Sequence, residues 1–122
     1  MASILVVDDQ ALVRNLFERV LKAEGHQVTL CENGQQGYDA AMQSSFDLIF
    51  TDHNMPFLGG IEMIEMLRSG EGPNRNTPML MASSDATPER KQKAKDAGAT
   101  GWITKPVPAE KILKLAEAVL PK

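Results

Sequence analysis

Short apolar runs alternate along the chain with longer stretches in which apolar and polar residues are mixed. Ile4–Val7, Asp47–Thr51 and Met79–Ala82 are short and predominantly apolar, which is typical of strands buried on both faces. Val28–Cys31 alternates between apolar and polar positions, and this predicts a half-buried strand at a sheet edge. Gly101–Thr104 is a further short run of the same kind. The pattern therefore predicts five short strands.

The stretches between these runs carry helical patterns. In Ala11–Glu24 apolar residues recur every three or four positions, from Leu12 through Phe17 to Leu21, which predicts one apolar helical stripe. Thr87 followed by Pro88 is typical of a helix start, with threonine as the N-cap. The predicted helices are Ala11–Glu24, Gln35–Gln43, a third marked by Ile61, Met63, Ile64 and Leu67, a fourth from Thr87 to Gly98, and Pro108–Leu120.

Strands and helices are thus expected to alternate five times. Buried strands separated by single helices predict a parallel sheet with right-handed crossovers and helices on both faces, an α/β fold. In such a sheet, binding sites form at the carboxyl ends of the strands. The segments His53–Gly60 and Gly70–Thr77 are rich in glycine, proline and asparagine and are predicted to be loops.

Composition narrows the class of protein. A chain of 122 residues with 43% hydrophobic residues is expected to form one domain, residues 1–122. The single cysteine, Cys31, excludes an internal disulfide and a cysteine-cluster metal site. A net charge of −3 argues against nonspecific nucleic-acid binding.

The chain also lacks the sequence signals of a membrane or secreted protein. No apolar run is long enough for a membrane span, and Met1 leads almost directly into a strand-like run, unlike a signal peptide. A cytoplasmic location without membrane contact is therefore expected. The start at Met1 favours a protein that works alone over a fragment of a longer regulator or hybrid kinase, and we expect a monomer.

Chemically active side chains follow four of the predicted strands. They are Asp8, Asp9, Asp52, Ser83, Ser84 and Lys105. Crowded carboxylates repel one another unless a cation offsets them, and a hard divalent cation such as Mg²⁺ prefers oxygen ligands. A lysine and a hydroxyl nearby match what phosphoryl transfer requires, which is positioning and neutralisation of phosphate oxygens. Because Asp52 lies centrally in the order of strands, we expect its carboxylate to be the nucleophile, with Asp8 and Asp9 as metal ligands.

These motifs, in this order and spacing, resemble the receiver domains of bacterial response regulators, and most of all the stand-alone, chemotaxis-type, CheY-like members. The resemblance spans the whole chain and is carried by Val6–Asp9, Phe50–Pro56, Gly60, Met81–Ser84 and Thr104–Pro106. It implies a doubly wound, flavodoxin-like fold of five parallel strands in the order 2-1-3-4-5 with five helices. It also implies a phosphorylation-activated signalling switch rather than an enzyme in the usual sense.

The resemblance assigns a role to each matching residue. Asp8, Asp9 and Asp52 are expected to bind Mg²⁺ through their carboxylates, with the Asn54 backbone carbonyl as a further ligand. A sensor histidine kinase is expected to phosphorylate Asp52. The residues expected to respond are Ser83 as the mobile hydroxyl, Lys105 as the phosphate-binding cation before a cis peptide bond to Pro106, and Trp102 as the switch aromatic.

The resemblance also indicates how the signal leaves the domain. The fourth helix, fifth strand and fifth helix are expected to form the output face for an unidentified protein partner. Arg90, Lys91, Lys93 and Lys95 make the fourth helix basic, which fits either a solvated face or a docking surface for an acidic segment. Asn54 and Asp85 are polar residues that can orient a water molecule, and they predict a phosphorylated state lasting seconds to minutes.

Other interpretations remain open from the sequence. Asp8 and Asp9 can serve as a helix cap, and Trp102 as ordinary core packing. His53 is expected on the side opposite Asp52, because neighbouring side chains alternate in an extended chain. The main alternative function is a small Mg²⁺-dependent phosphohydrolase with an aspartyl nucleophile, although Asp8-Asp9 lacks the Asp-x-Asp spacing of such enzymes. A phosphorylation-independent interaction module is a third possibility. The sequence specifies neither the kinase nor the pathway.

Overall fold

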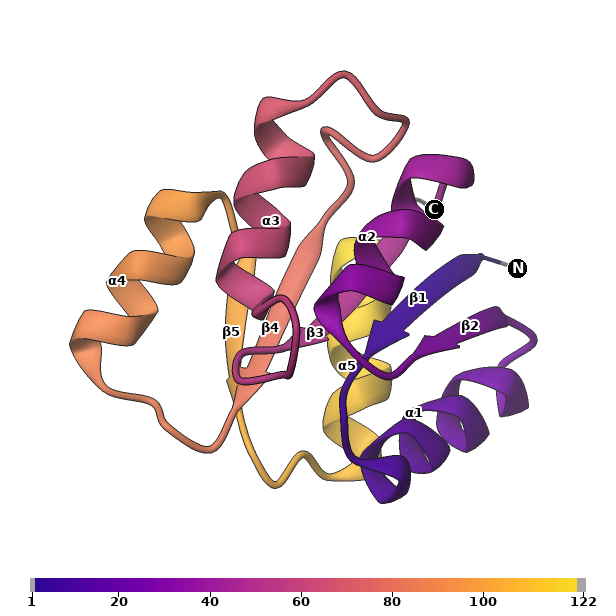
Figure 1. Ribbon diagram of the computed structural model, residues 1–122. Helices are drawn as coiled ribbons and strands as arrows, with labels where there is room; N and C mark the ends of the chain where they lie inside the picture. The colour runs from indigo at the N-terminus through magenta and orange to yellow at the C-terminus, as the bar shows by residue number, and fades with distance from the viewer. Residues whose placement is uncertain (1, 121–122) are drawn as a thin grey trace.

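Five strands and five helices alternate in the computed structural model, which describes residues 2–120 (Figure 1). The strands are β1 (Ser3–Val7), β2 (Gln27–Cys31), β3 (Leu48–Asp52), β4 (Met79–Ser83) and β5 (Gly101–Thr104). Each strand lies where the apolar runs predicted one, with its ends shifted by at most one residue.

The helices also lie at the predicted places. They are α1 (Ala11–Ala23), α2 (Gly34–Gln43), α3 (Gly60–Ser69), α4 (Pro88–Ala97) and α5 (Ala109–Val119). Thr87 caps α4 as predicted, because its hydroxyl accepts a hydrogen bond from the Arg90 backbone N–H at 3.4 Å. Gly98 ends this helix in the left-handed conformation, with φ of 113°. No helix within residues 2–120 is long and apolar enough to cross a membrane.

All five strands are parallel and lie in the order β2-β1-β3-β4-β5. This confirms the predicted flavodoxin-like fold with its strand order 2-1-3-4-5. The register aligns the carboxyl ends, since Val7 pairs with Thr51 and Ser83 with Thr104. From β1 the chain moves to opposite sides to form β2 and β3, so the topological switch point lies between β1 and β3.

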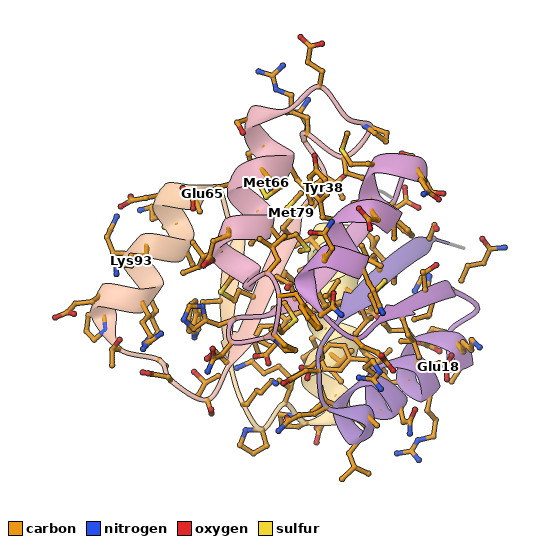
Figure 2. The ribbon with its side chains drawn as sticks, viewed as in Figure 1. Glu18, Tyr38, Glu65, Met66, Met79 and Lys93 are labelled. Atoms are coloured by element: carbon orange, nitrogen blue, oxygen red, sulfur yellow. The ribbon has the colours of Figure 1, made fainter. Side chains whose placement is uncertain are left out.

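Helices cover both faces of the sheet because successive strand residues point to opposite sides. Leu5, Val7 and Ile49 pack on one side with residues of α2, α3 and α4, whereas Val6 and Phe50 pack on the other with α1 and α5. Figure 2 shows Met79 in the middle of the molecule and Lys93 on the outer side of α4. The alternating pattern of the strands therefore builds two hydrophobic clusters.

One expected core position is wrong. Leu12, which the helical stripe of α1 was predicted to include, is 85% exposed. Phe17 and Leu21 on the same helix are buried as expected. Leu12 belongs to the first turn of α1 and lines the cavity at the carboxyl ends of the strands, so it does not pack onto the sheet.

The polar loop before β4 contains a buried hydrogen-bonding centre that the sequence analysis did not foresee. The Asn74 side chain is fully buried and its Oδ1 accepts from the Phe46 backbone N–H at 2.8 Å and from the Thr77 hydroxyl at 3.0 Å. Its Nδ2 donates to the backbone carbonyls of Ala41 and Ser44. Asn74 therefore joins the α2–β3 and α3–β4 connections at the amino end of the sheet.

Candidate functional site

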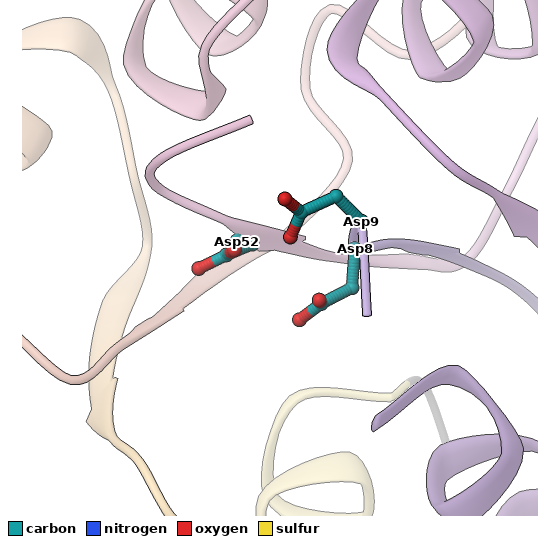
Figure 3. Close-up of side chains that lie close together, drawn as sticks. All are labelled: Asp8, Asp9 and Asp52. Carbon is teal, nitrogen blue, oxygen red and sulfur yellow. The ribbon is translucent and has the colours of Figure 1, made fainter. Parts of the chain in front are cut away.

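Three carboxylates meet at the carboxyl end of the sheet, beside the switch point. Asp8 and Asp9 directly follow β1, and Asp52 is the last residue of the neighbouring strand β3. One carboxylate oxygen from each lies within 4.8 Å of the others, and Figure 3 shows the three groups directed into the same space. Asp8 and Asp52 are buried, whereas Asp9 is exposed. The structure thus brings together the acidic residues that the sequence analysis selected.

Lys105 completes this cluster from the end of β5. Its Nζ lies 2.7 Å from Asp8 Oδ2 and 3.3 Å from Asp52 Oδ1, so one ammonium group contacts two buried carboxylates. The peptide bond between Lys105 and Pro106 is cis, as the resemblance implied. The lysine side chain is only 12% exposed, so this contact is screened little by water.

The charges in this cluster shift one another's protonation. Burial raises the pKa of Asp52 and the charge of Asp8 raises it further, to about 6, although Lys105 and the His53 backbone N–H act in the opposite direction. Burial acts to lower the pKa of Lys105, but its hydrogen bond to Asp8 and the charges of Asp8 and Asp52 outweigh burial, so this pKa is raised. The lysine therefore stays protonated at neutral pH. Asp52 is mostly ionised at the same pH, which lies about one unit above its raised pKa.

Backbone contacts hold the two buried carboxylates in place. Asp8 Oδ1 accepts from the Gln10 backbone N–H at 2.9 Å, and Asp52 Oδ1 accepts from the His53 backbone N–H at 2.8 Å. Gln10, not Asp8 or Asp9, occupies the N-cap position of α1, so the helix-cap interpretation of the acidic pair does not hold. Gly60 passes so near that a Cβ there would lie 2.0 Å from the Asp52 carbonyl oxygen, which explains the need for glycine at the start of α3.

Ser83 and Asn54 border the same cavity, which has a volume of about 710 Å³. Ser83 is the last residue of β4 and is buried, and its hydroxyl accepts from the Asp85 backbone N–H at 3.2 Å. Asn54 is exposed in the β3–α3 loop. The residues that were predicted for the site and line this cavity are Asp9, Asp52, Asn54, Ser83, Ser84, Asp85 and Lys105.

Trp102 lies next to the site rather than in it. It belongs to β5, is half-buried, and packs against the hydrophobic cluster under α2, α3 and α4. Its ring centroid is 6.4 Å from that of His53. The indole Nε1 is buried and has no hydrogen-bond partner within the part of the chain that the structure describes. Core packing is therefore observed for Trp102, and its switch role stays a prediction.

Sequence reasoning missed a polar contact across the mouth of the cavity. Arg90 of α4 lies 2.7 Å from the Asp85 carboxylate through its Nε, and its Nη1 donates to His53 Nε2. His53 was expected on the side opposite Asp52, but it lines the same cavity. Burial and the charge of Arg90 lower the pKa of His53. Because 37 residues separate His53 from Arg90, no local pattern connects the two.

The donor set fits a hard divalent cation. Carboxylate oxygens from two neighbouring strands converge within 4.8 Å, and the exposed Asp9 leaves one side open to water, which Mg²⁺ retains in its shell. Sulfur ligands, which favour zinc or copper, are not part of this cluster. The residues present are therefore able to hold Mg²⁺.

Comparison with known proteins agrees with this geometry. The model of the response regulator receiver domain family matches residues 4–117. The sensory/regulatory protein RpfC of Xanthomonas campestris pv. campestris is 38% identical over 111 residues, which are 89% of this chain and 15% of RpfC. The transcriptional regulatory protein YkoG of Bacillus subtilis is 33% identical over 118 residues, 96% of this chain and 50% of YkoG. The chain thus spans half or less of the length of these two relatives.

Solved structures show the same fold. Chemotaxis response regulator CheY4 of Vibrio cholerae superposes with a TM-score of 0.92 at 36% identity, covering 98% of this chain and 99% of CheY4. The receiver domain of sensor histidine kinase PA1611 from Pseudomonas aeruginosa, solved with magnesium coordinated in its active site cleft, gives a TM-score of 0.88 at 24% identity, covering 97% and 96%. The chain therefore belongs to the family of response regulator receiver domains, the signalling modules of two-component systems.

Proposed function

We propose that residues 1–122 form one receiver domain in which Asp52 accepts a phosphoryl group from a phosphohistidine of a sensor histidine kinase. One observation carries the proposal. Asp52 ends the central strand β3 with its carboxylate in contact with Lys105 and beside two further carboxylates. A carboxylate placed among groups that can neutralise phosphate oxygens is suited to form an acyl phosphate.

The reaction requires an ionised Asp52. One carboxylate oxygen attacks phosphorus, the phosphorus–nitrogen bond of the phosphohistidine breaks, and its electron pair returns to the imidazole of the kinase. With a pKa of about 6, Asp52 is mostly ionised at neutral pH and can act as this nucleophile. Lys105 offers a fixed positive charge for one phosphoryl oxygen.

Mg²⁺ is the proposed cofactor. Asp8, Asp9 and Asp52 would hold it through carboxylates, and the Asn54 backbone carbonyl would be a further ligand. When bound, Mg²⁺ supplies the positive charge that offsets the phosphoryl oxygens and the crowded carboxylates. The oxygen-only cluster of Asp8, Asp9 and Asp52 supports this choice of metal.

Phosphorylation would redistribute the contacts of Lys105, which lies against Asp8 and Asp52. We propose that the lysine turns to the phosphoryl group and that the Ser83 hydroxyl moves to a second oxygen. Because Ser83 pairs with Thr104 at the end of β5, this movement can reach Trp102 on the same strand. The proposed output is a changed face of α4, β5 and α5.

The proposed downstream partner is a protein with an acidic segment. The exposed side of α4 carries Arg90, Lys91, Lys93 and Lys95, which suits an acidic segment of a downstream protein. A role in chemotaxis, a monomeric state and a cytoplasmic location stay predictions. Slow autodephosphorylation, over seconds to minutes, is also proposed, with Asn54 and Asp85 placed at the cavity to orient water.

Acetyl phosphate tests the proposed acceptor. The chain is incubated with Mg²⁺ and acetyl phosphate and compared with the Asp52→Asn variant by intact mass. Wild type is expected to gain one phosphate and Asp52→Asn none, whereas a gain in both would remove Asp52 from this role.

Lys105→Ala is expected to keep metal binding but lose most of the change in Trp102 fluorescence that phosphorylation causes. Steady turnover of small phosphate esters would instead support a phosphohydrolase.

A further inference from the structure

Arg90 connects the loop that directly follows the proposed phosphoacceptor with the loop after the neighbouring strand β4. Its Nε pairs with Asp85 in the β4–α4 loop at 2.7 Å, and its Nη1 donates to His53 in the β3–α3 loop. Arg90, Asp85 and His53 all line the cavity that contains Asp52. The side chains of Arg90 and Asp85 are 44% and 47% exposed, so the pair contributes little to stability. Its position at the cavity mouth suggests another purpose.

The contact with His53 is chemically specific. An arginine guanidinium can only donate hydrogen bonds, so His53 Nε2 is the acceptor in this contact. Arg90 therefore holds the His53 ring in one orientation. The His53 backbone N–H in turn donates to Asp52 Oδ1 at 2.8 Å, so the residue that Arg90 holds is in contact with the acceptor carboxylate.

The contact with Asp85 occupies the acid closest in sequence to Ser83. The Asp85 backbone N–H donates to the Ser83 hydroxyl at 3.2 Å, so this turn borders the acceptor. The Asp85 carboxylate is held by the Arg90 guanidinium at 2.7 Å at the cavity that contains Asp52. While Arg90 is in place, this carboxylate is occupied and is less free to orient a water molecule beside Asp52.

We propose that Arg90 is a positioning residue that prolongs the phosphorylated state by holding Asp85 and His53 across the cavity mouth. The inference rests on the proposed phosphorylation of Asp52. In the hydrolysis that it slows, a water oxygen attacks phosphorus and the bond from phosphorus to the Asp52 oxygen breaks. The electron pair of that bond restores the carboxylate, inorganic phosphate leaves with the oxygen of the water, and the proton of the water passes to solvent. Asp85, when unpaired, orients the water for this attack.

The test measures how fast the phosphorylated chain loses its phosphate. Protein is phosphorylated with acetyl phosphate and Mg²⁺, the donor is removed, and the decay is followed by intact mass. Arg90→Gln is expected to shorten the half-life about five- to tenfold, less than the 10²–10⁴-fold of full general-base catalysis, because a released Asp85 orients the water without taking its proton. Arg90→Lys, which keeps a cation beside Asp85, is expected to restore most of the half-life.

Two further variants separate positioning from general effects. Arg19→Gln makes the same substitution at an exposed site on α1, away from the cavity, and is expected to decay like wild type. In an Asp85→Asn background, adding Arg90→Gln is expected to change the half-life less than twofold, since Arg90 then has no carboxylate to hold. Far-ultraviolet circular dichroism checks that each variant is folded.

The outcomes distinguish this inference from the function on which it rests. If wild type gains no phosphate, or Asp52→Asn also gains it, the proposed function fails and the inference fails with it. If Asp52 is phosphorylated but Arg90→Gln decays at the wild-type rate, only the role of Arg90 is overturned. Equal acceleration by Arg90→Gln with and without Asp85 would likewise overturn positioning through Asp85.

Discussion

Replacing Asp52 by asparagine is expected to stabilise the fold at neutral pH in the absence of metal. Burial and the charge of Asp8 raise the pKa of Asp52 from 3.8 to about 6, so the folded protein binds this proton more tightly than the unfolded chain does. Because the pKa of Asp52 is higher in the folded protein, its protonated form stabilises the fold, and this contribution is complete at pH values below the unfolded pKa of 3.8. The contribution is lost as the pH rises through the folded pKa of about 6, so the stability of wild type changes mainly between these two pH values.

The size of the effect follows from the shift. About 2 pKa units at 1.36 kcal/mol each correspond to about 3 kcal/mol of unfolding free energy. Asparagine has nearly the same shape, does not titrate, and can still accept from the His53 backbone N–H. Lys105 keeps Asp8 as its partner at 2.7 Å. The stability of Asp52→Asn relative to wild type should therefore increase by about 2.5 kcal/mol between about pH 4 and pH 7.5, slightly less than the full shift because Asp52 of the unfolded chain is already partly ionised at pH 4.

Urea unfolding with Trp102 fluorescence, in EDTA, measures this difference at both pH values. Asp96→Asn, which makes the same substitution at an exposed position of α4, is the matched control. Comparison with wild type at each pH cancels the other titrating groups. A difference for Asp52→Asn that is equal at both pH values, or a wild type that is the more stable protein at neutral pH, would refute the reasoning.

Three other predictions concern separate parts of the chain. Asn74→Ala removes a buried side chain with four hydrogen bonds and should lower the unfolding free energy by about 3 kcal/mol, and a loss below about 1 kcal/mol in urea titrations would contradict this. Phe57→Asn should raise it by about 1 kcal/mol, because Phe57 has a φ of 68° and is 88% exposed, and destabilisation would count against this. Mg²⁺ at a hundred times its Kd should stabilise wild type by about 3 kcal/mol, and Asp9→Asn should need a higher Mg²⁺ concentration, whereas identical titrations would exclude Asp9 as a ligand.

The fold could be predicted because its sequence signals are strong and local. β3 and β4 are short, uninterrupted apolar runs, and strands buried on both faces leave few other interpretations. Gly98 marks the end of α4 through its left-handed backbone. The acidic cluster followed from the same logic, since Asp8 directly follows β1 and Asp52 ends the neighbouring parallel strand β3, so the two meet at one edge of the sheet.

The parts that escaped prediction depend on contacts between distant residues. Asn74 sits in a polar loop, where an asparagine is expected to be solvated, and only the folded chain brings Phe46 and Ala41 to it. His53 was expected on the side opposite Asp52, but β3 ends at Asp52, so strand alternation does not extend to the next residue. Its contact with Arg90 then depends on how α4 is placed, which the apolar pattern does not specify.

The two ends of the sheet are joined by different kinds of bond. At the amino end, Asn74 and Thr77 connect loops through hydrogen bonds between neutral groups, which keep their strength when a charge is added elsewhere. At the carboxyl end, Lys105 and Arg90 connect loops through ionic contacts, whose partners compete for the same cation. A new negative charge can therefore change which anionic group each of these cations contacts at the carboxyl end, while the hydrogen bonds at the amino end stay as they are. A receiver domain built this way can change conformation repeatedly at one end of its sheet without losing stability at the other.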